Sequence, residues 1–465
     1  MIGLRLTSLA LFISTISSSY AGGFSLYTEG SAAEVGVFAA GAAAEAQDAS
    51  IGWYNPAGLV LLQKNEALLS GVGVMPVSKI SGTSSYYTDA LAPYQQSFVK
   101  LSGGQQAIVP AIHLSHPLGP RAVFGLSVVS PFGLSTSWPE EAATRYAATL
   151  TKLLTANLSP EMGVLLTDHL AFGAGLDLQY ADVKFDGVAG SPAALQYLES
   201  VHVPVTPSML DSSSNNEGSS MGVGFHTGLL ALFNQNHTRI GLNYQSQVKH
   251  QFEGHSILKG RLASPTLTNP FNEYKLDGLY SNYVALPDVI TLSAYQDITK
   301  KFALLGSVLH TGWSSFKTIE LYNVAGFSTE SSEQAPINLI TPQNYRDTWR
   351  AALGGNYHVN DRLMLRLGGG YDQTPTVNAE RDIRLPDVDR GAISAGLHYQ
   401  VTPALGFDVG YTYLFGIGQS SINKTQVFDE LSSVKIEAQA MNHAQLAGIQ
   451  AVWNFDAVAG KAATK

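Results

Sequence analysis

Residues 406–415 read GFDVGYTYLF, and they alternate between two kinds of side chain. One set is entirely apolar or aromatic: Phe407, Val409, Tyr411, Tyr413 and Phe415. The other set is small, polar or mixed: Gly406, Asp408, Gly410, Thr412 and Leu414. Because successive side chains of a β-strand point to opposite faces, this period of two predicts a strand with one apolar, aromatic face.

The same alternation recurs along most of the chain, for example in residues 362–372, 172–180 and 240–245. We expect about fourteen strands, at 66–81, 106–117, 121–132, 151–166, 169–186, 220–234, 237–254, 284–298, 301–316, 345–359, 362–373, 389–401, 404–416 and 441–455. Tight turns alternate with long loops between them. This pattern is typical of a transmembrane antiparallel β-barrel in a bacterial outer membrane. The barrel has to close, because an open sheet edge in lipid leaves backbone groups unpaired.

The composition favours a barrel over a soluble β-sandwich or a helical membrane protein. Charged residues make up only 14% of the chain, whereas soluble proteins average about 25%. After the N-terminus, polar residues or glycines interrupt every apolar stretch well short of the roughly 18 residues that a spanning helix needs. There is no cysteine, which excludes disulfides and thiolate metal sites. The net charge of -9, without a basic block, argues against nucleic acid as a partner.

The first 21 residues have the features of a secretory signal peptide. Arg5 supplies a positive charge, residues 6–16 are mostly apolar, and Ser19-Tyr20-Ala21 fits a cleavage site. Residues 65–455 form the expected barrel. Residues 456–465 follow the last aromatic residue, Phe455, and are expected to form a periplasmic tail.

Residues 22–64 are rich in Ala and Gly and lack the alternation of a strand. A barrel of about fourteen strands encloses a lumen wider than its own side chains can fill, since about eight strands already suffice for a small interior. We therefore expect this segment to fill the lumen as a small hatch. Asn55-Pro56-Ala57 near its end predicts a fixed turn, because Pro56 restricts the backbone of Asn55.

Several motifs follow one another along the chain: Gly23-Phe24-Ser25-Leu26, GAAAEAQDAS at 41–50, Asn55-Pro56-Ala57, Trp313-Ser314-Ser315-Phe316, YDQTP at 371–375 and LPDVDR at 385–390. In this order they resemble the FadL-type outer-membrane transporters (OmpP1/FadL/TodX) of long-chain fatty acids and aromatic hydrocarbons. The resemblance implies an N-terminal hatch and release of ligand sideways into the membrane through a kinked strand. It implies a long-chain fatty acid or another hydrophobic small molecule as ligand. We expect a monomeric barrel, surrounded by outer-membrane lipid and lipopolysaccharide, without cofactor or metal.

The resemblance also suggests binding residues. It implies an inner hydrophobic site at the start of the mature chain, at Phe24 and Leu26. Residues 191–210 and 257–283 are unusually apolar for loops, and by resemblance they form an outer groove that includes Leu195, Tyr197, Leu198, Leu258, Leu262 and Phe271. The alternative is that they pack over the barrel mouth. A ligand carboxylate would need a cation, and the candidates are Lys184, Arg145, Arg350 and Arg366. Asp372 lies where the family keeps an acidic residue, and the alternative is that it only pairs with Arg381 or Arg384.

We place the kinked strand at Ser130-Pro131-Phe132-Gly133, since a proline removes one donor from the hydrogen-bonded ladder. Alternatively, Pro131 only ends the strand at the rim. A polar porin, a surface adhesin and an outer-membrane lipid hydrolase are the other functional hypotheses. The hydrolase would have to use His113, Ser115 and His116, and the sequence lacks HExxH and GxSxG motifs. We expect no enzymatic activity.

Overall fold

The structure is a computed structural model, and it describes residues 24–88, 91–190, 192–206, 209–328, 333–428 and 430–457. The expected signal peptide lies outside these residues, as does most of the expected tail. Among the residues that the structure describes, no helix is both long and apolar enough to cross a membrane.

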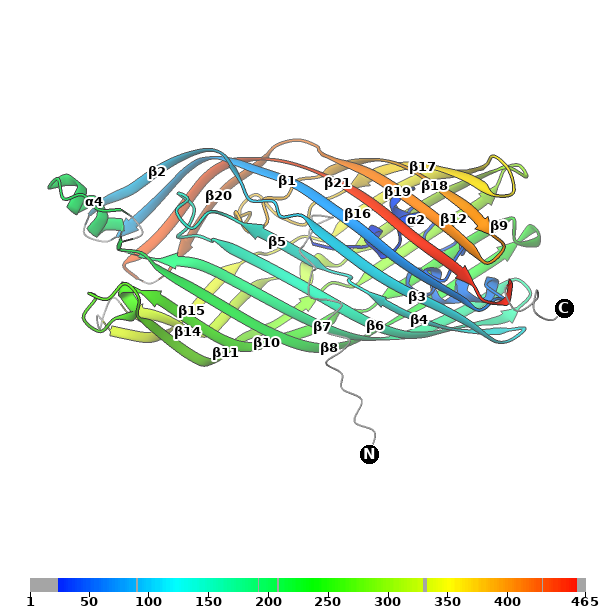
Figure 1. The fold of residues 1–465 in the computed structure, drawn as a ribbon, viewed down its shortest axis with the longest axis horizontal. Helices are drawn as coiled ribbons and strands as arrows, with labels where there is room; N and C mark the ends of the chain where they lie inside the picture. Colours follow the sequence, from blue (N-terminus) through cyan, green and yellow to red (C-terminus); the bar gives the residue numbers. More distant parts are fainter. Residues whose placement is uncertain are drawn as a thin grey trace, which may run out of the picture.

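The chain forms one closed antiparallel barrel of fourteen strands (Figure 1). Some strands are continuous: β1 (Glu66–Thr88), β6 (Leu150–Thr167), β7 (Leu170–Ala189), β8 (Ser212–Phe233), β17 (Leu363–Asp372), β18 (Arg390–Thr402) and β21 (Ser432–Asn454). The other strands consist of two segments each: β2 (Leu91–Ser102) with β3 (Ala107–Gly119), β4 (Ala122–Val129) with β5 (Gly133–Ser137), β9 (Thr238–Gln245) with β10 (Val248–Gly260), β11 (Glu273–Leu286) with β12 (Val289–Asp297), β13 (Phe302–Thr311) with β14 (Thr318–Ser328), β15 (Glu333–Pro342) with β16 (Thr348–His358), and β19 (Leu405–Gly416) with β20 (Ser420–Val427).

The first and last strands close the barrel. β1 and β21 pair without interruption from Glu66 opposite Asn454 to Thr88 opposite Ser432. Asp456, just beyond β21, accepts hydrogen bonds from the backbone N–H (2.7 Å) and the side-chain amide (2.8 Å) of Asn65. Both ends of the ladder are therefore tied together at one rim, and the pairing of β1 with β21 leaves neither of these two strands as a free edge.

The alternation seen in the sequence becomes a division between lipid and lumen. In β19, Val409, Tyr411 and Tyr413 are exposed on the outer surface, whereas Asp408 and Thr412 are buried inside. An apolar, aromatic exterior with a polar interior is the arrangement that a barrel in lipid requires.

Several strands extend farther beyond the membrane than the sequence predicts. Residues 82–105 and 417–440, expected as connections, contain β2, β20 and parts of β1 and β21. The expected loop at 257–283 is also mostly strand, because β10 extends to Gly260 and β11 begins at Glu273. These extensions are rich in Ser, Thr, Asn and Gln. Beyond the lipid neither face has to be apolar, so the period of two that identifies a strand is absent.

The two rims differ as expected. One end carries short turns, such as those between β3 and β4 and between β18 and β19. The other end carries the long connections, with the helix α4 (Pro192–Ser200) and the short helix η5 (Arg261–Ala263) (Figure 1). The short-turn rim also holds the small helix η4 (Asn234–Asn236). Short turns mark the periplasmic side of an outer-membrane barrel.

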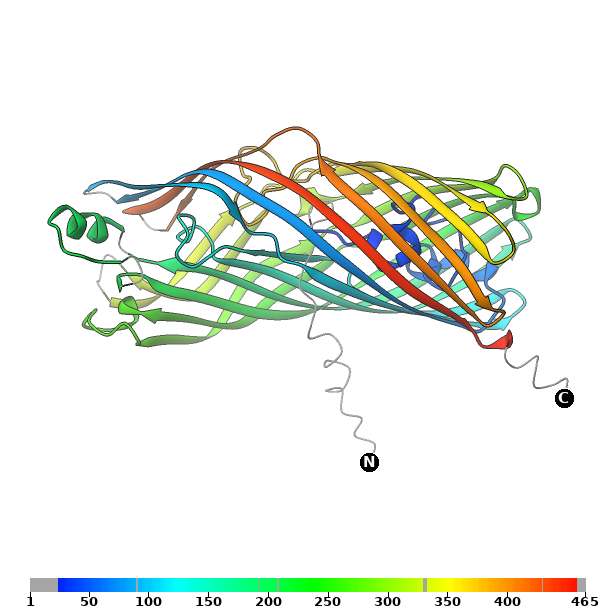
Figure 2. The ribbon, with the colours of Figure 1, turned by 45° about the horizontal axis from the view of Figure 1, so that its top comes forward.

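Residues 24–62, which we call the luminal segment, lie inside the barrel (Figures 1 and 2). The segment contains η1 (Thr28–Gly30), α2 (Ala32–Val35), α3 (Ile51–Tyr54) and η2 (Pro56–Leu61). α2 contacts β19 and β21, and η2 contacts β6, β7 and β8. Almost all of its side chains are buried. This part of the chain therefore packs against the inner wall of the barrel.

Small residues and wall hydroxyls allow this close packing. A Cβ atom on Gly410 would overlap the carbonyl oxygen of Ala32. Some backbone N–H groups of the segment have no partner within a helix and donate to serine hydroxyls of the barrel wall. The N–H of Gly41, for example, donates to the hydroxyl of Ser307 (2.8 Å). Such partners matter because an unpaired buried N–H is costly.

Candidate functional site

The barrel wall is interrupted where the sequence predicts a kink. β4 ends at Val129 and β5 begins at Gly133. On one side β5 pairs normally with β6. On the other side, the described ladder stops at the pair Ile112–Val128, and beyond it only a single bridge joins Gly104 to Thr136. Ser130, Pro131 and Phe132 therefore lie at an opening in the hydrogen-bonded wall, which we call the wall break.

β5 is displaced toward the lumen. Four consecutive residues, beginning at Gly133, are buried, so this segment lacks the alternating exposure of the other strands. Thr155 of β6 satisfies the backbone of Phe132, because its hydroxyl accepts from the N–H (2.9 Å) and donates to the carbonyl (2.7 Å). A side chain thus replaces the missing ladder bonds. The alternative that Pro131 merely ends a strand at the rim does not describe this geometry, since β5 continues the strand.

The start of the luminal segment pairs with the wall break. Ser25 and Phe132 form an antiparallel bridge. The N–H of Leu26 donates to the carbonyl of Pro131 (2.8 Å), and the N–H of Gly133 donates to the carbonyl of Phe24 (2.9 Å). The segment thus takes up the backbone groups that the interrupted strand leaves unpaired.

Phe24 lies within a group of rings that we call the aromatic cluster. Its ring centroid is 4.5 Å from that of Trp313 and 5.4 Å from that of Phe316. The remaining members are Phe132 (6.2 Å) and Tyr345 (6.4 Å). The edge-to-face angles and short separations are typical of favourable aromatic packing. Leu134, Leu153, Val183, Leu286 and Leu385 extend the same buried apolar core around the cluster.

Asn55 fixes the end of the luminal segment. Its side-chain amide donates to the carbonyl oxygens of Ala43 (2.7 Å) and of Leu229 in β8 (3.0 Å). Its Oδ1 accepts from the N–H of Ala57 (3.1 Å), while Pro56 opens the helix η2. The predicted fixed turn is therefore also a contact between the segment and the wall.

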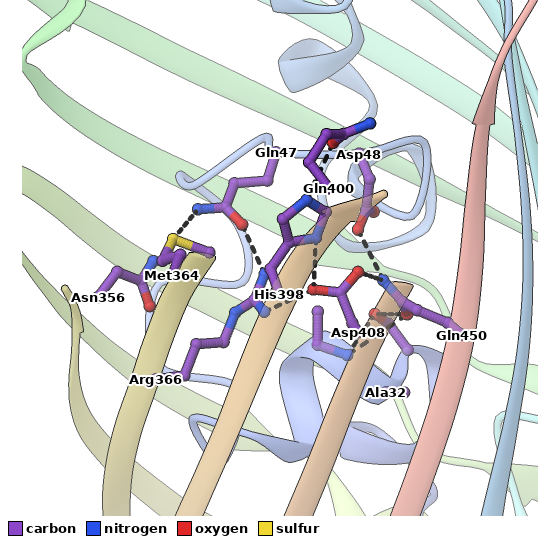
Figure 3. A network of polar contacts seen from close by, with 12 residues as sticks. Ala32, Gln47, Asp48, Asn356, Met364, Arg366, His398, Gln400, Asp408 and Gln450 are labelled. Carbon is purple, nitrogen blue, oxygen red and sulfur yellow. Dashed lines mark hydrogen bonds and ion pairs between the residues drawn. The ribbon is translucent and has the colours of Figure 1, made fainter. Parts of the chain in front are cut away.

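A polar network anchors the segment on its periplasmic side (Figure 3). Arg366 donates to Asp408 (2.5 Å) and to Gln47 of the segment (2.7 Å). Gln450 donates to Asp48 of the segment and to Asp408, both at 3.0 Å. Next to these residues is a polar cavity of about 310 Å³. Most of the residues that line this cavity at the periplasmic side of the segment are polar or charged.

The four cations suggested as carboxylate partners have other partners in the structure. Arg350 donates to the hydroxyl of Thr28 and to the carbonyl of Phe38 (3.2 Å), and lies over the ring of Phe38. The ion pairs of the other three are Lys184–Glu217 (2.8 Å), Arg145–Asp211 (2.7 Å) and Arg366–Asp408 (2.5 Å). Asp372 pairs with Arg390 (3.0 Å). Arg381 donates to Thr376 and Asn378, and Arg384 donates to Thr151 and to the carbonyl of Ala147.

The residues suggested for an outer groove lie at the extracellular end. Leu195, Tyr197 and Leu198 belong to α4, which contacts β2. Leu258 is buried with Ala263 and Ala325, and Leu262 packs beside them. Phe271 is 83% exposed. The structure thus places α4 and the η5 region in separate contacts with the barrel, and no described hydrophobic cluster contains residues of both.

The histidine group considered for hydrolysis does not assemble. His113 hydrogen-bonds to Ser127 (2.8 Å) and to the carbonyl of Gly30 (2.9 Å). Ser115 donates instead to the carbonyl of Lys64 (3.2 Å). The described nucleophile and base candidates therefore do not meet, as nucleophilic catalysis requires.

Sequence reasoning assigned no role to Trp313, Phe316 or Tyr345. Trp313 opens the short helix η6 (Trp313–Ser315), a break between β13 and β14 that points inward. The available signal was the presence of two aromatic residues, Trp313 and Phe316, at the end of the predicted strand 301–316. Their approach to Phe24 depends on contacts between distant parts of the chain.

These features define a class of protein: a closed outer-membrane β-barrel with its own N-terminal segment in the lumen and an interrupted wall strand. The chain belongs to the family of outer membrane protein transport proteins (OMPP1/FadL/TodX), whose model matches residues 10–455.

Relatives match over most of their length. The chain is 28% identical over 439 residues to the long-chain fatty acid transport protein of Escherichia coli K12, covering 88% of this chain and 92% of that one. It is 28% identical over 443 residues to the outer membrane protein P1 of Haemophilus influenzae, covering 90% and 92%. The crystal structure of a Pseudomonas aeruginosa FadL homologue has a TM-score of 0.77 at 24% identity, covering 93% and 100%. The Pseudomonas putida toluene transporter TodX has a TM-score of 0.64 at 14% identity, covering 95% and 100%.

Proposed function

We propose that this protein carries long-chain fatty acids or other hydrophobic small molecules through the outer membrane and releases them sideways through the wall break. The pairing of Phe24 and Leu26 with the wall break, inside an aromatic cluster, carries this proposal. An apolar molecule gains from apolar surroundings and avoids buried charges. The side chains that pack around the wall break are mostly apolar, whereas Arg366, Asp408 and Asp48 lie at the periplasmic side of the luminal segment.

The relatives with known cargo support a hydrophobic ligand. The Escherichia coli relative is named for long-chain fatty acids, and the structural neighbour from Pseudomonas putida is a toluene transporter. In this proposal Phe24 and Leu26 form the inner site, and Ser130, Pro131, Phe132 and Gly133 form the gate.

The extracellular residues supply first capture. Tyr197 and Phe271 are exposed at this end, and large exposed apolar side chains outside the lipid are favourable contacts for an apolar ligand. Together with Leu195, Leu198, Leu258 and Leu262 they form the outer apolar surface of the proposal.

The rest of the chain has supporting roles. Residues 1–21 are a cleaved signal peptide, residues 22–64 a hatch held at Asn55, Pro56 and Ala57, and residues 456–465 a periplasmic tail. The barrel works as a monomer in contact with lipid and lipopolysaccharide, and it catalyses no reaction.

Uptake of labelled oleate tests the proposal. A strain that lacks the gene should take up oleate several-fold more slowly than the same strain carrying the intact gene. A strain that carries the gene with Asn55→Ala shows how far oleate uptake depends on the anchoring of the hatch at Asn55. Equal uptake with and without the intact gene, across several chain lengths, would contradict the fatty-acid version.

A further inference from the structure

The barrel wall has a second interruption, between β11 and β14. The described ladder between these two strands consists of two adjacent pairs and stops at Ser281 and Leu321. The ladder between β12 and β13 lies on the periplasmic side of this place. Residues 283–287 therefore face residues 313–319 without a described ladder pair, and we call this interval the side gap.

Side chains bridge the side gap in place of a backbone ladder. The amide of Asn282 donates to the carbonyl of Thr318 (2.9 Å), and its Oδ1 accepts from the N–H of Glu320 (3.1 Å). The hydroxyl of Ser315 reaches the carbonyl of Ala285 at 3.5 Å, which is long for a hydrogen bond. Separating the two strands here breaks a few side-chain contacts and no continuous ladder, so it costs less than elsewhere in the wall.

The aromatic cluster lies directly inside the side gap. Val284 and Leu286 of β11 are buried in the same apolar core as Phe24. Trp313 and Phe316 come from the other edge of the gap, and their ring centroids lie 4.5 Å and 5.4 Å from that of Phe24. Both edges of the gap therefore carry side chains of the core that packs around the wall break.

The outer side of the side gap lies at the boundary of the lipid. His310 and Trp349 are paired just on the periplasmic side of the gap, and their ring centroids are 4.8 Å apart. Trp349 is exposed, and tryptophan and tyrosine gather where lipid meets water. Tyr283, at the edge of the gap, is 70% exposed. An amphiphile in the outer leaflet therefore lies beside the gap.

The connection between β5 and β6 packs inside the extracellular end of the barrel. Its residues Trp138 and Tyr146 are buried in one cluster with the inward-facing Ile80 of β1. Arg145, on the same connection, is fully buried and pairs with Asp211 (2.7 Å). A ligand that entered along the barrel axis from this end would have to displace these contacts.

We propose that hydrophobic cargo enters the barrel from the outer leaflet through the side gap and reaches the aromatic cluster without passing along the barrel axis. The inference rests on the proposed function and adds the point of entry. The cargo then crosses the cluster from Trp313 at the side gap to Phe132 at the wall break, whose ring centroids lie 6.0 Å apart. It stays in apolar surroundings throughout, which favours an apolar molecule.

Blocking the side gap tests the proposal. The native chain has no cysteine, so Tyr283→Cys offers a single thiol at the edge of the gap. A bulky, membrane-impermeant methanethiosulfonate reagent should lower the initial rate of labelled oleate uptake several-fold in cells with this variant, and a reductant should restore the rate. Met441→Cys is the matched control, because Met441 is a 57% exposed residue of β21, on another part of the wall. Modification of Met441→Cys should leave the rate unchanged.

Removing the bridge tests the proposal in the opposite direction. Asn282→Ala should raise the initial rate of oleate uptake several-fold, because separating the two strands no longer breaks the two bonds of Asn282. Asn323→Ala is the control, since Asn323 also joins β14 to β11, through the carbonyls of Asp277 (3.2 Å) and Gly278 (3.1 Å), but lies outside the gap. Its rate should not change. Heat-modifiable migration on a gel verifies that each variant is folded.

The outcomes separate this inference from the proposed function. An unchanged rate in modified Tyr283→Cys, or an equal loss in modified Met441→Cys, would overturn entry through the side gap while leaving hydrophobic transport intact. Equal rates in Asn282→Ala and Asn323→Ala would also contradict it. Equal uptake with and without the intact gene would instead overturn the proposed function, and this inference with it.

Discussion

The backbone N–H of Gly133 donates to the carbonyl oxygen of Phe24 across 2.9 Å. This bond joins the first described residue of the luminal segment to the first residue beyond the wall break. A segment that fills the lumen thereby also completes the interrupted wall. Closing the lumen and closing the side opening are consequently coupled through one short stretch of chain.

Phe24→Ala should loosen this stretch. Removing a buried phenylalanine from a packed cluster costs about 3 to 5 kcal/mol, and here the loss falls on the docking of the segment. Peptides covering residues 24–35 should exchange amide hydrogens faster, and conductance in a planar bilayer should rise. Phe271→Ala removes an exposed ring and should change neither the amide exchange nor the conductance. Equal exchange in Phe24→Ala and the wild type would contradict the coupling.

A disulfide between positions 25 and 132 should lock the segment onto the wall break. Ser25 and Phe132 are bridge partners, and paired residues lie about 4.5 to 5.5 Å apart between Cα atoms, within disulfide range. The native chain has no cysteine to compete. Oxidised Ser25→Cys/Phe132→Cys cells should take up little oleate, and a reductant should restore uptake to the level of Phe132→Cys alone. If the reductant leaves oleate uptake unchanged, the contact between Ser25 and Phe132 does not have to open during transport.

Docking of the segment should weaken as pH rises. Glu29 is fully buried, and neither carboxyl oxygen has a hydrogen-bond partner. Burial raises the pKa of Glu29 from 4.5 to about 7. The docked segment therefore binds a proton more tightly than the undocked one, so its stability is fully present below pH 4.5 and is lost as pH rises through 7. Protection factors at residues 28–35, which are corrected for the intrinsic pH dependence of amide exchange, should fall between pH 5 and pH 8. Glu29→Gln should reduce this fall, and a fall unchanged in that variant would assign it to another group, such as Glu34, whose pKa burial also raises.

Asn55→Ala should destabilise the end of the luminal segment. It leaves the carbonyls of Ala43 and Leu229 without this donor, and an unsatisfied buried polar group costs about 1 to 3 kcal/mol. Hydrogen exchange at residues 43–57 should increase by about tenfold or more. Gln63→Ala removes an exposed side chain that bonds only Val60 and should leave this exchange unchanged. Equal protection in both variants would exclude an anchoring role for Asn55.

The sequence predicts the parts of this protein that lipid constrains. In β19 and β17, alternating residues must face lipid, so the periodicity identifies the strands and their number. Where β2, β20 and the ends of β10 and β11 extend into water, this constraint vanishes and so does the signal. Pro131 was detectable because its missing N–H is a local property.

The site itself depends on contacts that no local pattern encodes. Phe24 meets Trp313 and Tyr345 only because the luminal segment folds back into the barrel. Pairing with Arg381 or Arg384 was one alternative for Asp372, and the structure pairs Asp372 with Arg390. The connection between β17 and β18 carries Arg384 to β5 and β6. Such placements follow from the closed topology, so they appear in the structure and not in the spacing of residues.

Photo-crosslinking of a diazirine fatty acid to the purified protein in lipid nanodiscs, with the sites mapped by mass spectrometry, tests the sideways route most directly. We predict that the ligand crosslinks to residues within 24–26 and to residues within 132–134, on the two sides of the wall break. Crosslinks confined to the periplasmic cavity around Gln47, Met364 and His398 would contradict it, because they would place the exit along the barrel axis.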